Sequence, residues 1–321
     1  MTNFYGQFIG FGAGGAAAPF VRPWGGTSHG YRAGGYNSAS GYGWPNNNTD
    51  TIDKYAYASD GDASDVGNLT ARTDGNACHS SETYGYAATG DHPVTTTIWK
   101  WAFASDGDAS AYSGDLTGGG WASTGTYSKE NGYTSGRNNS GPFFDTVDKF
   151  NFASENDATD VGNLTVGRSY TASQSSETHG HCSGGSGGGR RDEIDRWAFA
   201  SDGDATDVGD ILAGNAQPSG SQSQSYGYMA GGQTTPGGFS NVIQKFAFSS
   251  SADSTDVADL ASGANSGGGS SSTTHGYHTG GGQNTTAGSD IIQKYGTASD
   301  GDATDIGNLT ESIIYTAGCQ Y

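Results

Sequence analysis

The acidic residues of this chain have the clearest potential for chemistry. Asp60, Asp62 and Asp65 lie within one short segment, and the same spacing recurs at Asp202, Asp204 and Asp207 and at Asp300, Asp302 and Asp305. Carboxylates grouped in a tight loop are typical ligands of Ca²⁺. The EF-hand spacing is not met, however, and a related segment keeps only Asp253 and Asp256. We therefore expect turns rather than a metal site and predict no cofactor, with calcium as the alternative.

A basic residue precedes each acidic segment. It recurs every 46 to 49 residues, at Lys54, Lys100, Lys149, Arg196, Lys245 and Lys294. If the strand that carries it is packed on both faces, this side chain is buried and needs a carboxylate partner. We predict a ladder of ion pairs, each within one hairpin: Lys54–Asp65, Lys149–Asp160, Arg196–Asp207, Lys245–Asp256 and Lys294–Asp305. A carboxylate from the next repeat is the alternative partner.

The sequence offers no catalytic constellation. No Ser-His-Asp or Cys-His arrangement can be singled out among so many serines. The glycine run at 187–189 lacks the Lys-Ser/Thr of a phosphate-binding loop. Cys78, Cys182 and Cys319 are far apart and form no CxxC motif, so we expect buried thiols rather than zinc ligands. A non-enzymatic protein is the prediction.

Six copies of one pattern position these residues. The first, TIDKYAYASDGDASDVGNLT, begins at Thr51, and it combines an alternating aromatic segment with a turn at Asp60-Gly61. A two-residue Asp-Gly turn predicts a β-hairpin in which Lys54 lies opposite Gly67 and Tyr55 opposite Val66. Between the hairpins recurs a glycine-aromatic step that leads to a glycine-rich segment, such as HGYRAGG from His29. Each period thus contains about four short strands, as does one blade of a propeller.

These motifs resemble those of a known class of repeat. A double-glycine strand, an aromatic strand, a turn and a short final strand are similar to the kelch type of β-propeller. The wording K-F-x-F-A-S-D-G-x-A-T-D-V-G-x-L with GY-x-x-GG resembles repeats in structural proteins of marine T4-like bacteriophages, over roughly residues 27–319. The resemblance implies an all-β, six-bladed, kelch-like propeller of four-stranded blades in a virion protein.

The ends of the chain are expected to complete the ring. We predict the propeller over residues 27–321, and residues 1–26 as an N-terminal strand that closes the ring or attaches the protein to a neighbour. A strand at 312–317 is expected to complete a blade begun by N-terminal residues, because an unpaired edge would invite unwanted strand pairing. The termini are thus predicted to close the ring.

Composition excludes several classes of partner. The formal net charge is −19 with only 14 Lys and Arg, so a nucleic-acid groove is not expected. No apolar run approaches 18 residues, which predicts no membrane insertion. The first residues, MTNFYGQF, lack the features of a secretion signal. Release by lysis fits that absence, so a virion is the predicted location.

Four aromatic residues are the candidate contact site. Trp24, Trp44 and Trp121 stand in glycine-rich segments outside the hairpins, and Tyr127 follows Trp121. An exposed aromatic ring suits stacking on sugars or packing on a protein; the alternative is that the rings tuck under their own loops. We predict a fibre or surface appendage that contacts other virion proteins or host surface glycans. A capsid decoration protein and a secreted carbohydrate-active or lectin-like propeller are the alternatives.

Overall fold

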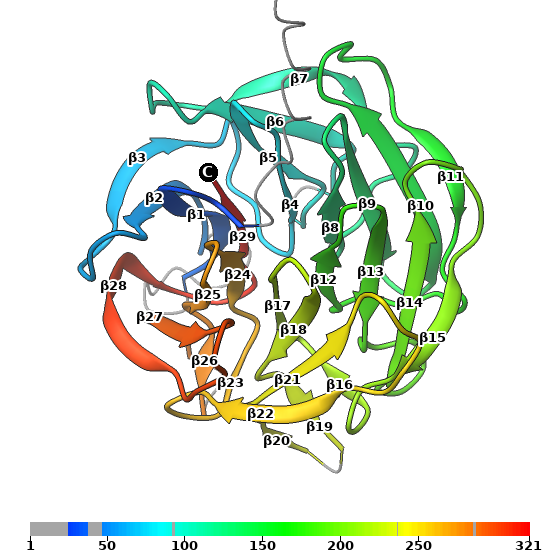
Figure 1. The fold of residues 1–321 in the computed structure, drawn as a ribbon. Helices are drawn as coiled ribbons and strands as arrows, with labels where there is room; N and C mark the ends of the chain where they lie inside the picture. Colours follow the sequence, from blue (N-terminus) through cyan, green and yellow to red (C-terminus); the bar gives the residue numbers. More distant parts are fainter. Residues whose placement is uncertain (1–24, 38–46, 92–93, 236, 285–286) are drawn as a thin grey trace, which may run out of the picture.

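The computed structural model describes residues 25–37, 47–91, 94–235, 237–284 and 287–321. Within these residues the chain is all-β, and it forms six four-stranded antiparallel sheets around a common centre (Figure 1). No helix long and apolar enough to cross a membrane occurs in this part of the chain. The fold is thus the predicted all-β class, in a propeller-like arrangement.

Five of the six sheets are each built from one continuous stretch of the chain, whereas sheet I combines the C-terminal strand with three N-terminal strands. In each sheet the strands are given below in order from the centre outward. Sheet I consists of β29 (Ala317–Gln320), β1 (His29–Tyr36), β2 (Asn48–Ala56) and β3 (Ser64–Asn68). Sheet II consists of β4 (Ala77–Ser80), β5 (Tyr84–Ala88), β6 (Thr97–Ala102) and β7 (Ser110–Asp115). Sheet III consists of β8 (Thr124–Tyr127), β9 (Asn131–Asn138), β10 (Phe143–Asn151) and β11 (Thr159–Asn163).

The second half of the chain repeats this order. Sheet IV consists of β12 (Ala172–Ser175), β13 (His179–Ser183), β14 (Glu193–Ala198) and β15 (Thr206–Asp210). Sheet V consists of β17 (Ser219–Gln222), β18 (Tyr226–Ala230), β21 (Val242–Ala247) and β22 (Thr255–Asp259). Sheet VI consists of β24 (Gly268–Ser271), β25 (His275–Thr279), β27 (Ser289–Gly296) and β28 (Thr304–Ile313).

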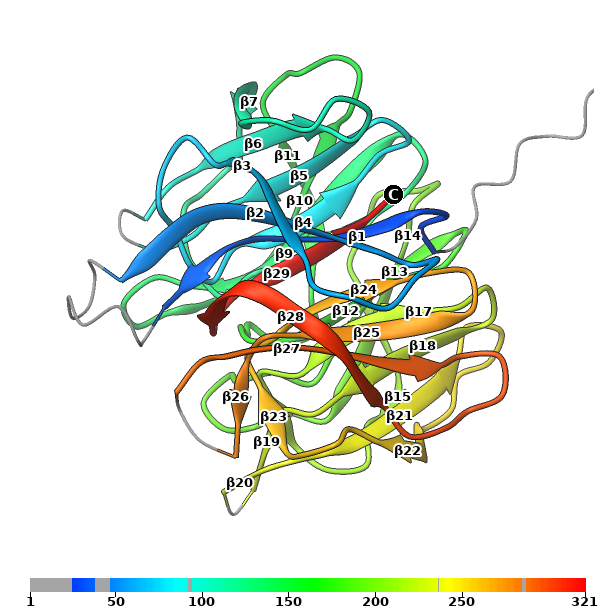
Figure 2. The ribbon, with the colours of Figure 1, turned by 90° about the vertical axis from the view of Figure 1, so that its left-hand side faces the viewer.

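Two small additional sheets lie at one end of the molecule. They are formed by β16 (Asn215–Ala216), β19 (Gln233–Thr234) and β20 (Gly238–Phe239), and by β23 (Ala264–Asn265) and β26 (Gly282–Gln283). Figure 2 shows both on the side from which the C-terminal strand β29 starts. We call this end of the molecule the entry face, because each innermost strand begins there.

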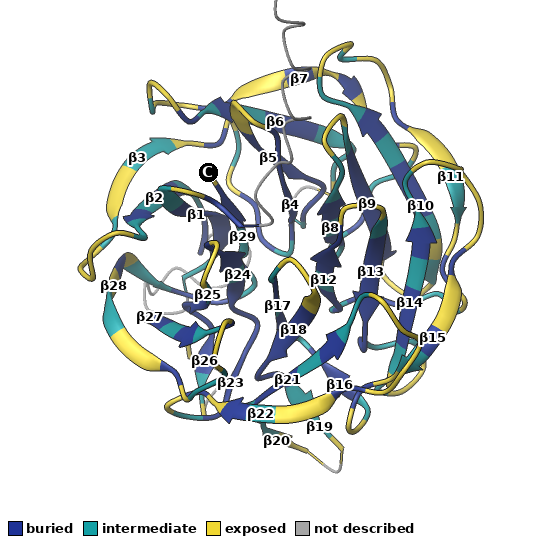
Figure 3. Ribbon diagram, viewed as in Figure 1, coloured by how far each residue is buried: buried dark blue, intermediate teal, exposed yellow. Residues whose placement is uncertain are grey.

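The sheets pack through the repeated aromatic residues. A Cβ atom at Gly30 would lie 2.3 Å from the Tyr55 ring, so glycine is required where that ring crosses strand β1. The next residue, Tyr31, packs against Phe103 of the neighbouring sheet with ring centroids 4.9 Å apart. Both faces of a sheet are therefore buried, while the outermost strands remain exposed (Figure 3). The glycine-aromatic step thus lets aromatic rings lie flat between sheets.

The predicted hairpin register is wrong. Lys54 lies opposite Ser64 rather than Gly67, and the two strands shift register between Ile52 and Asp53. The turn is longer than two residues because its residues form hydrogen bonds with the neighbouring sheet instead of pairing within the hairpin. The Ala63 amide, for example, donates to the Asn308 carbonyl over 2.7 Å. A register shift occurs at the equivalent place in all six hairpins, so this irregularity is a general feature of the repeat.

The C-terminal strand pairs with the N-terminal part of the chain. Residues 317–320 form β29, which pairs with β1 from Gly30 to Ala33. The C-terminal end of the chain thus pairs with the N-terminal part as predicted, but the predicted bounds are wrong: residues 312–313 belong to the end of β28, and the pairing strand is 317–320. Sheets VI and I also share a buried cluster that includes Tyr55 and Tyr277. The predicted strand within residues 1–26 lies outside the described residues, except for the last two.

Candidate binding site at the entry face

The innermost strands start from a repeated, unusual backbone conformation. Two residues before each of these strands stands a residue with φ between 54° and 65°. We call these six residues the mouth ring: Tyr315, Gly75, Ala122, Tyr170, Gln217 and Ser266. A left-handed conformation is cheap for glycine but costs roughly 1–2 kcal/mol for other residues. Five of the six positions therefore hold a strained residue.

Backbone hydrogen bonds join the mouth ring across the sheets. The Gly75 amide donates to the Tyr315 carbonyl over 2.8 Å, and the Ala122 amide donates to the Gly75 carbonyl over 2.7 Å. The amides of Tyr170, Gln217 and Ser266 continue this series, each over 2.8 Å. The mouth ring surrounds a cavity of about 100 Å³ that the starts of the innermost strands also line. The backbone thereby holds side chains of different sheets at fixed separations around one opening.

A hollow of about 330 Å³ opens beside this cavity. We call it the mouth hollow, and its lining residues are Asp74, Gly75, Asp91, Trp121, Ser140, Tyr170 and Tyr315. The rings of Trp121 and Tyr170 meet edge to face with centroids 5.4 Å apart, and Tyr170 and Tyr315 are 6.1 Å apart. All three aromatic residues are half-buried. Three sheets thus contribute one aromatic surface.

Two carboxyl groups lie in the same lining. The Asp74 side chain is buried, and its Oδ1 accepts a hydrogen bond from Asn48 Nδ2 over 3.2 Å. Asp91 is half-buried, and its amide donates to the Asp74 carbonyl over 3.0 Å. Burial and then the charge of Asp91 raise the pKa of Asp74 to about 7. Near neutral pH the Asp74 carboxyl is therefore partly protonated.

The structure separates the aromatic residues that the sequence grouped. Trp121 lines the mouth hollow, whereas Trp24 and Trp44 lie outside the described residues. Tyr127 is the last residue of β8 and so lies at the opposite end of that strand from Trp121. Trp121 and Tyr127 therefore do not form one contact surface on a loop, because Tyr127 belongs to an innermost strand.

Tyr127 instead takes part in a polar cluster where the innermost strands end. Its hydroxyl is within hydrogen-bonding distance of the amide groups of Gln222 and Gln320, at 3.0 Å for Gln222. These three residues come from sheets III, V and I, and the strands between them end in Ser80, Ser175 and Ser271. The Tyr127 amide donates to Ser175 Oγ over 3.0 Å. Large side chains from alternate sheets thus meet at the end of the cavity away from the entry face.

The predicted ladder of ion pairs within hairpins is wrong. The lysines pair with the turn of the next hairpin, which was the alternative, in the pairs Lys54–Asp106, Lys100–Glu155, Lys149–Asp202, Lys245–Asp300 and Lys294–Asp60. Because of the changed register, the predicted partner Asp65 accepts a hydrogen bond from the Gly67 amide instead, over 3.1 Å. Asp160, Asp207 and Asp305 make the same contact, with the amides of Gly162, Gly209 and Gly307. No such bond or ion pair is found for Asp256 among the described residues.

Arg196 is the exception among the repeated cations. Its counterpart turn residue in the next hairpin is Ser251, and no carboxylate lies within 4.0 Å of Arg196 among the described residues. For the calcium alternative, the part of the chain that the structure describes contains no group of three or more His, Cys, Asp or Glu side chains that could hold a metal ion. The turn carboxylates serve contacts between sheets.

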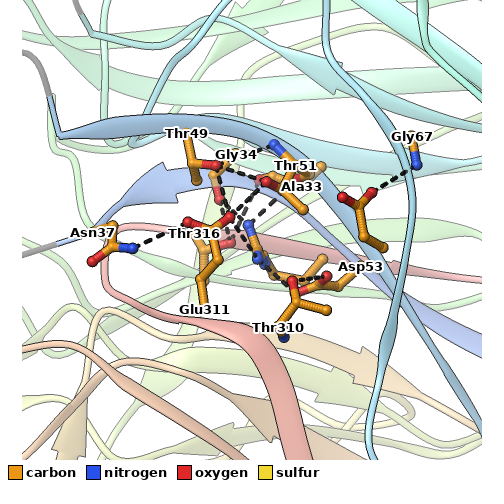
Figure 4. Close-up of polar contacts among 12 residues, drawn as sticks. Ala33, Gly34, Asn37, Thr49, Thr51, Asp53, Gly67, Thr310, Glu311 and Thr316 are labelled. Atoms are coloured by element: carbon orange, nitrogen blue, oxygen red, sulfur yellow. Dashed lines mark hydrogen bonds and ion pairs between the residues drawn. The ribbon is translucent and has the colours of Figure 1, made fainter. Parts of the chain in front are cut away.

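The fully buried ion pairs were missed. Arg32 contacts Asp53 at 2.6 Å with both side chains inaccessible to solvent. Asp148 and Asp195 occupy the places equivalent to Asp53 in sheets III and IV, and they pair with Arg137 and Arg168, which come from other positions in the repeat. Asp53 also accepts a hydrogen bond from the hydroxyl of Thr310 in sheet VI (Figure 4). The signal in the sequence was an acid within the apolar run of the TIDKY segment. The sequence does not show what this acid contacts, because one of its partners, Thr310, belongs to the neighbouring sheet.

Comparison with known proteins gives a likeness in structure but none in sequence. Neither a protein-family model nor a curated protein sequence matches the chain. Among solved structures, that of YjhT has a TM-score of 0.66 at 13% identity, covering 79% of this chain and 89% of that one. At such low identity the likeness concerns the fold alone. It identifies this chain as similar in architecture to YjhT.

Proposed function

We propose that this chain is a closed, six-bladed, kelch-like propeller. Support comes from the contacts between sheets VI and I, which repeat those between sheets I and II. The Ala63 amide donates to Asn308 just as the Ala109 amide donates to Asn68, both over 2.7 Å. Lys294–Asp60 likewise repeats Lys54–Asp106. The last and first repeats therefore make the same contacts with each other as two repeats that follow one another in the sequence.

We further propose that it is a non-enzymatic binding module whose ligand site is the mouth hollow. The observation that carries this proposal is the convergence of Trp121, Tyr170 and Tyr315 beside Asp74. Aromatic faces with a few fixed polar groups are typical of small-ligand sites. Two of the three rings are held in a backbone conformation that a glycine would adopt at lower cost, and such strain tends to mark functional sites.

The setting that we propose is a phage virion, in a fibre or surface appendage. The resemblance of the repeats to marine phage structural proteins supports it. Host surface glycans are the preferred ligand, and other virion proteins are the expected attachment partners. The net charge of −19 would keep crowded copies apart.

A carbohydrate-active enzyme is the second candidate. It is favoured by one observation, the raised pKa of Asp74 beside a second carboxyl, Asp91. Pairs of carboxyls with separated pKa values perform acid-base hydrolysis of glycosidic bonds. Release of reducing sugar by the purified protein, abolished in Asp74→Asn, would favour the enzyme over the binding module.

The experiment for the binding module is a glycan-binding screen with matched variants. Trp121→Ala is expected to weaken binding at least tenfold while the melting temperature changes little. Tyr226→Ala is the control, because Tyr226 is an exposed aromatic residue outside the mouth hollow. A Trp121→Ala protein that binds normally but melts far earlier would show that the ring only packs, and the proposal would be abandoned.

A further inference from the structure

A carboxylate is held between two strands where sheet VI meets sheet I. Glu311, in the last strand of sheet VI, accepts hydrogen bonds from the hydroxyl groups of Thr49 and Thr51 over 2.9 and 2.5 Å (Figure 4). Arg32 Nη2 lies 3.8 Å from the same carboxylate. Burial favours the neutral acid, but hydrogen bonds, above all that from Thr51, outweigh it and lower the pKa of Glu311. Two threonine hydroxyls and a guanidinium thus form a binding place for an ionised carboxylate.

The next pair of sheets repeats this place without its carboxylate. Where sheet I meets sheet II, Thr95 and Thr97 occupy the positions of the two threonines of sheet I, and Ala71 replaces Glu311. The hydroxyl oxygens of Thr95 and Thr97 are 2.9 Å apart, compared with 2.8 Å for the pair in sheet I. In both sheets the amide of the second threonine donates to the hydroxyl of the first, over 3.0 Å at Thr97. The acid is therefore missing, while the hydroxyl groups keep the arrangement that holds it in sheet I.

The small side chain of Ala71 leaves a hollow of about 240 Å³ at this place. We call it the threonine hollow, and its lining residues are residues 70–73, Thr95, Thr97 and Trp99. In the repeat these correspond to the surroundings of Glu311, namely residues 310–313, Thr49, Thr51 and Asp53. Trp99 forms a buried wall, and its indole Nε1 donates to Thr70 Oγ1 over 2.6 Å. The threonine hollow shares no lining residue with the mouth hollow and is therefore a separate site.

The threonine hollow has a positive charge and a hydroxyl donor for a ligand. Arg72 is exposed, and it is the only charged residue among the described residues of the lining. No ion pair or side-chain hydrogen bond of Arg72 is found in the part of the chain that the structure describes. The Thr97 hydroxyl accepts from Thr95, and among the described residues its own hydrogen has no acceptor. Because a guanidinium matches the two oxygens of a carboxylate, Arg72 can supply the charge that Arg32 supplies in sheet I.

From these observations we propose that the threonine hollow binds the carboxylate of a small organic acid. The Thr97 hydroxyl donates to one carboxylate oxygen, and the guanidinium of Arg72 pairs with the charge. At about 240 Å³ the hollow is smaller than the roughly 300–1,000 Å³ of typical small-molecule sites, so the group that enters it is no larger than about one sugar unit. An acidic sugar and a simple organic acid both carry this group. The site goes beyond the proposed function and does not depend on it.

The test compares ligands with and without a carboxylate. Binding of glucuronate, glucose and acetate to the full-length protein is measured by titration calorimetry at pH 7 and low salt. We expect glucuronate to bind at least tenfold more tightly than glucose, which has the same ring but no carboxylate. Acetate identifies the source of the carboxylate. Tighter binding of glucuronate than of acetate indicates an acidic sugar, and equal binding indicates a simple acid; both results support the carboxylate site.

Variants of the two donors locate the bound acid. Arg72→Gln removes the charge and Thr97→Val removes the hydroxyl at nearly constant shape, so each should weaken glucuronate binding at least tenfold. Lys129→Gln is the control, because Lys129 is an exposed cation that does not line the threonine hollow. The melting temperature of each variant shows whether it is folded.

A further variant fills the threonine hollow from within. Ala71→Glu restores the residue that sheet VI has at this place, so its carboxylate should occupy the hollow and abolish glucuronate binding while Arg72 and Thr97 are both retained. Ala71→Ser is the matched control, because its side chain is too short to reach the threonine hydroxyls. It should bind glucuronate as the original protein does.

Three outcomes would overturn the inference. If glucose binds as tightly as glucuronate, the carboxylate is not recognised. If folded Arg72→Gln and Ala71→Glu proteins bind glucuronate normally, the acid binds elsewhere on the protein. If the folded protein binds neither glucuronate nor acetate, the threonine hollow is only a gap in the packing between sheets I and II.

Discussion

Lys294 of the last hairpin forms an ion pair with Asp60 in the turn of the first hairpin. The two residues are 234 positions apart, yet their contact equals the one that every other repeat lysine makes with the next hairpin. A local feature of the repeat thus also joins the two ends of the chain.

This ion pair is expected to contribute little to stability. Asp60 has a side-chain exposure of 57%, and exposed pairs typically contribute about 0.2–1 kcal/mol because solvent and salt screen them. Asp60→Asn should therefore lower the free energy of unfolding by no more than about 1 kcal/mol in urea denaturation. A loss above roughly 3 kcal/mol, as for a buried pair, would contradict this expectation.

The ion pair that Arg196 lacks could be added to increase the stability of the protein. Ser251 occupies the place of the acidic turn residues, so Ser251→Asp should create the missing ion pair. We expect an increase of about 0.2–1 kcal/mol in the free energy of unfolding at low salt, which diminishes at high salt. Ser251→Asn, of similar size but uncharged, is the control. An equal gain from both variants would show that charge is not the cause.

Removal of the C-terminal strand should lower the stability of the protein far more than the loss of one exposed ion pair. Deleting residues 317–321 removes β29, the innermost strand of sheet I, and with it the buried Cys319. The edge of β1 would then be open to pairing with other chains. We expect a much lower melting temperature and aggregation, measured by calorimetry and light scattering. Melting of the truncated chain at the temperature of the full chain would show that this strand is dispensable.

Buried histidines should make the protein sensitive to acid. Burial lowers the pKa of His79 to about 4 from its ordinary 6.5. Below pH 6.5 the unfolded chain therefore binds a proton that the folded protein does not, so stability is complete above pH 6.5 and falls as the pH drops toward 4. This loss reaches roughly 3 kcal/mol at pH 4, since each pKa unit corresponds to about 1.4 kcal/mol.

His79→Gln should remove that part of the acid sensitivity. His79 Nε2 lies 3.0 Å from the Tyr133 carbonyl, and at the equivalent place in sheet IV Gln174 donates to the Tyr228 carbonyl over the same distance. A glutamine can therefore replace the histidine without titrating. Urea denaturation at pH 7 and pH 4.5 measures the difference. The variant keeps the buried His181 and His278, whose pKa values are also lowered, so part of the acid sensitivity should remain. If the variant lost as much stability between pH 7 and pH 4.5 as the original protein does, His79 would not be a source of the acid sensitivity.

The sequence by itself determined the elements and their number. Alternation around Tyr55, with a glycine at Gly30 to receive its ring, is a local pattern, and it recurs in register through the chain. Four short strands per repeat and an all-β fold follow from such local preferences, and the strand after Ile313 followed from the need to cover an edge. Buried thiols were predicted from the wide spacing of the three cysteines and the lack of a CxxC motif, and all three are buried.

Only the tertiary structure decided which residues meet. Lys54 has carboxylates close by in sequence but pairs with Asp106, because the turn of the next sheet lies closer to it than Asp65 does. The mouth hollow joins Asp74 to Tyr315, and the mouth-ring positions share a backbone conformation rather than a residue type. The ion-pair partner of each lysine and the composition of the mouth hollow depend on how sheets that are far apart in the sequence lie relative to one another. No pattern within a single repeat carries that information.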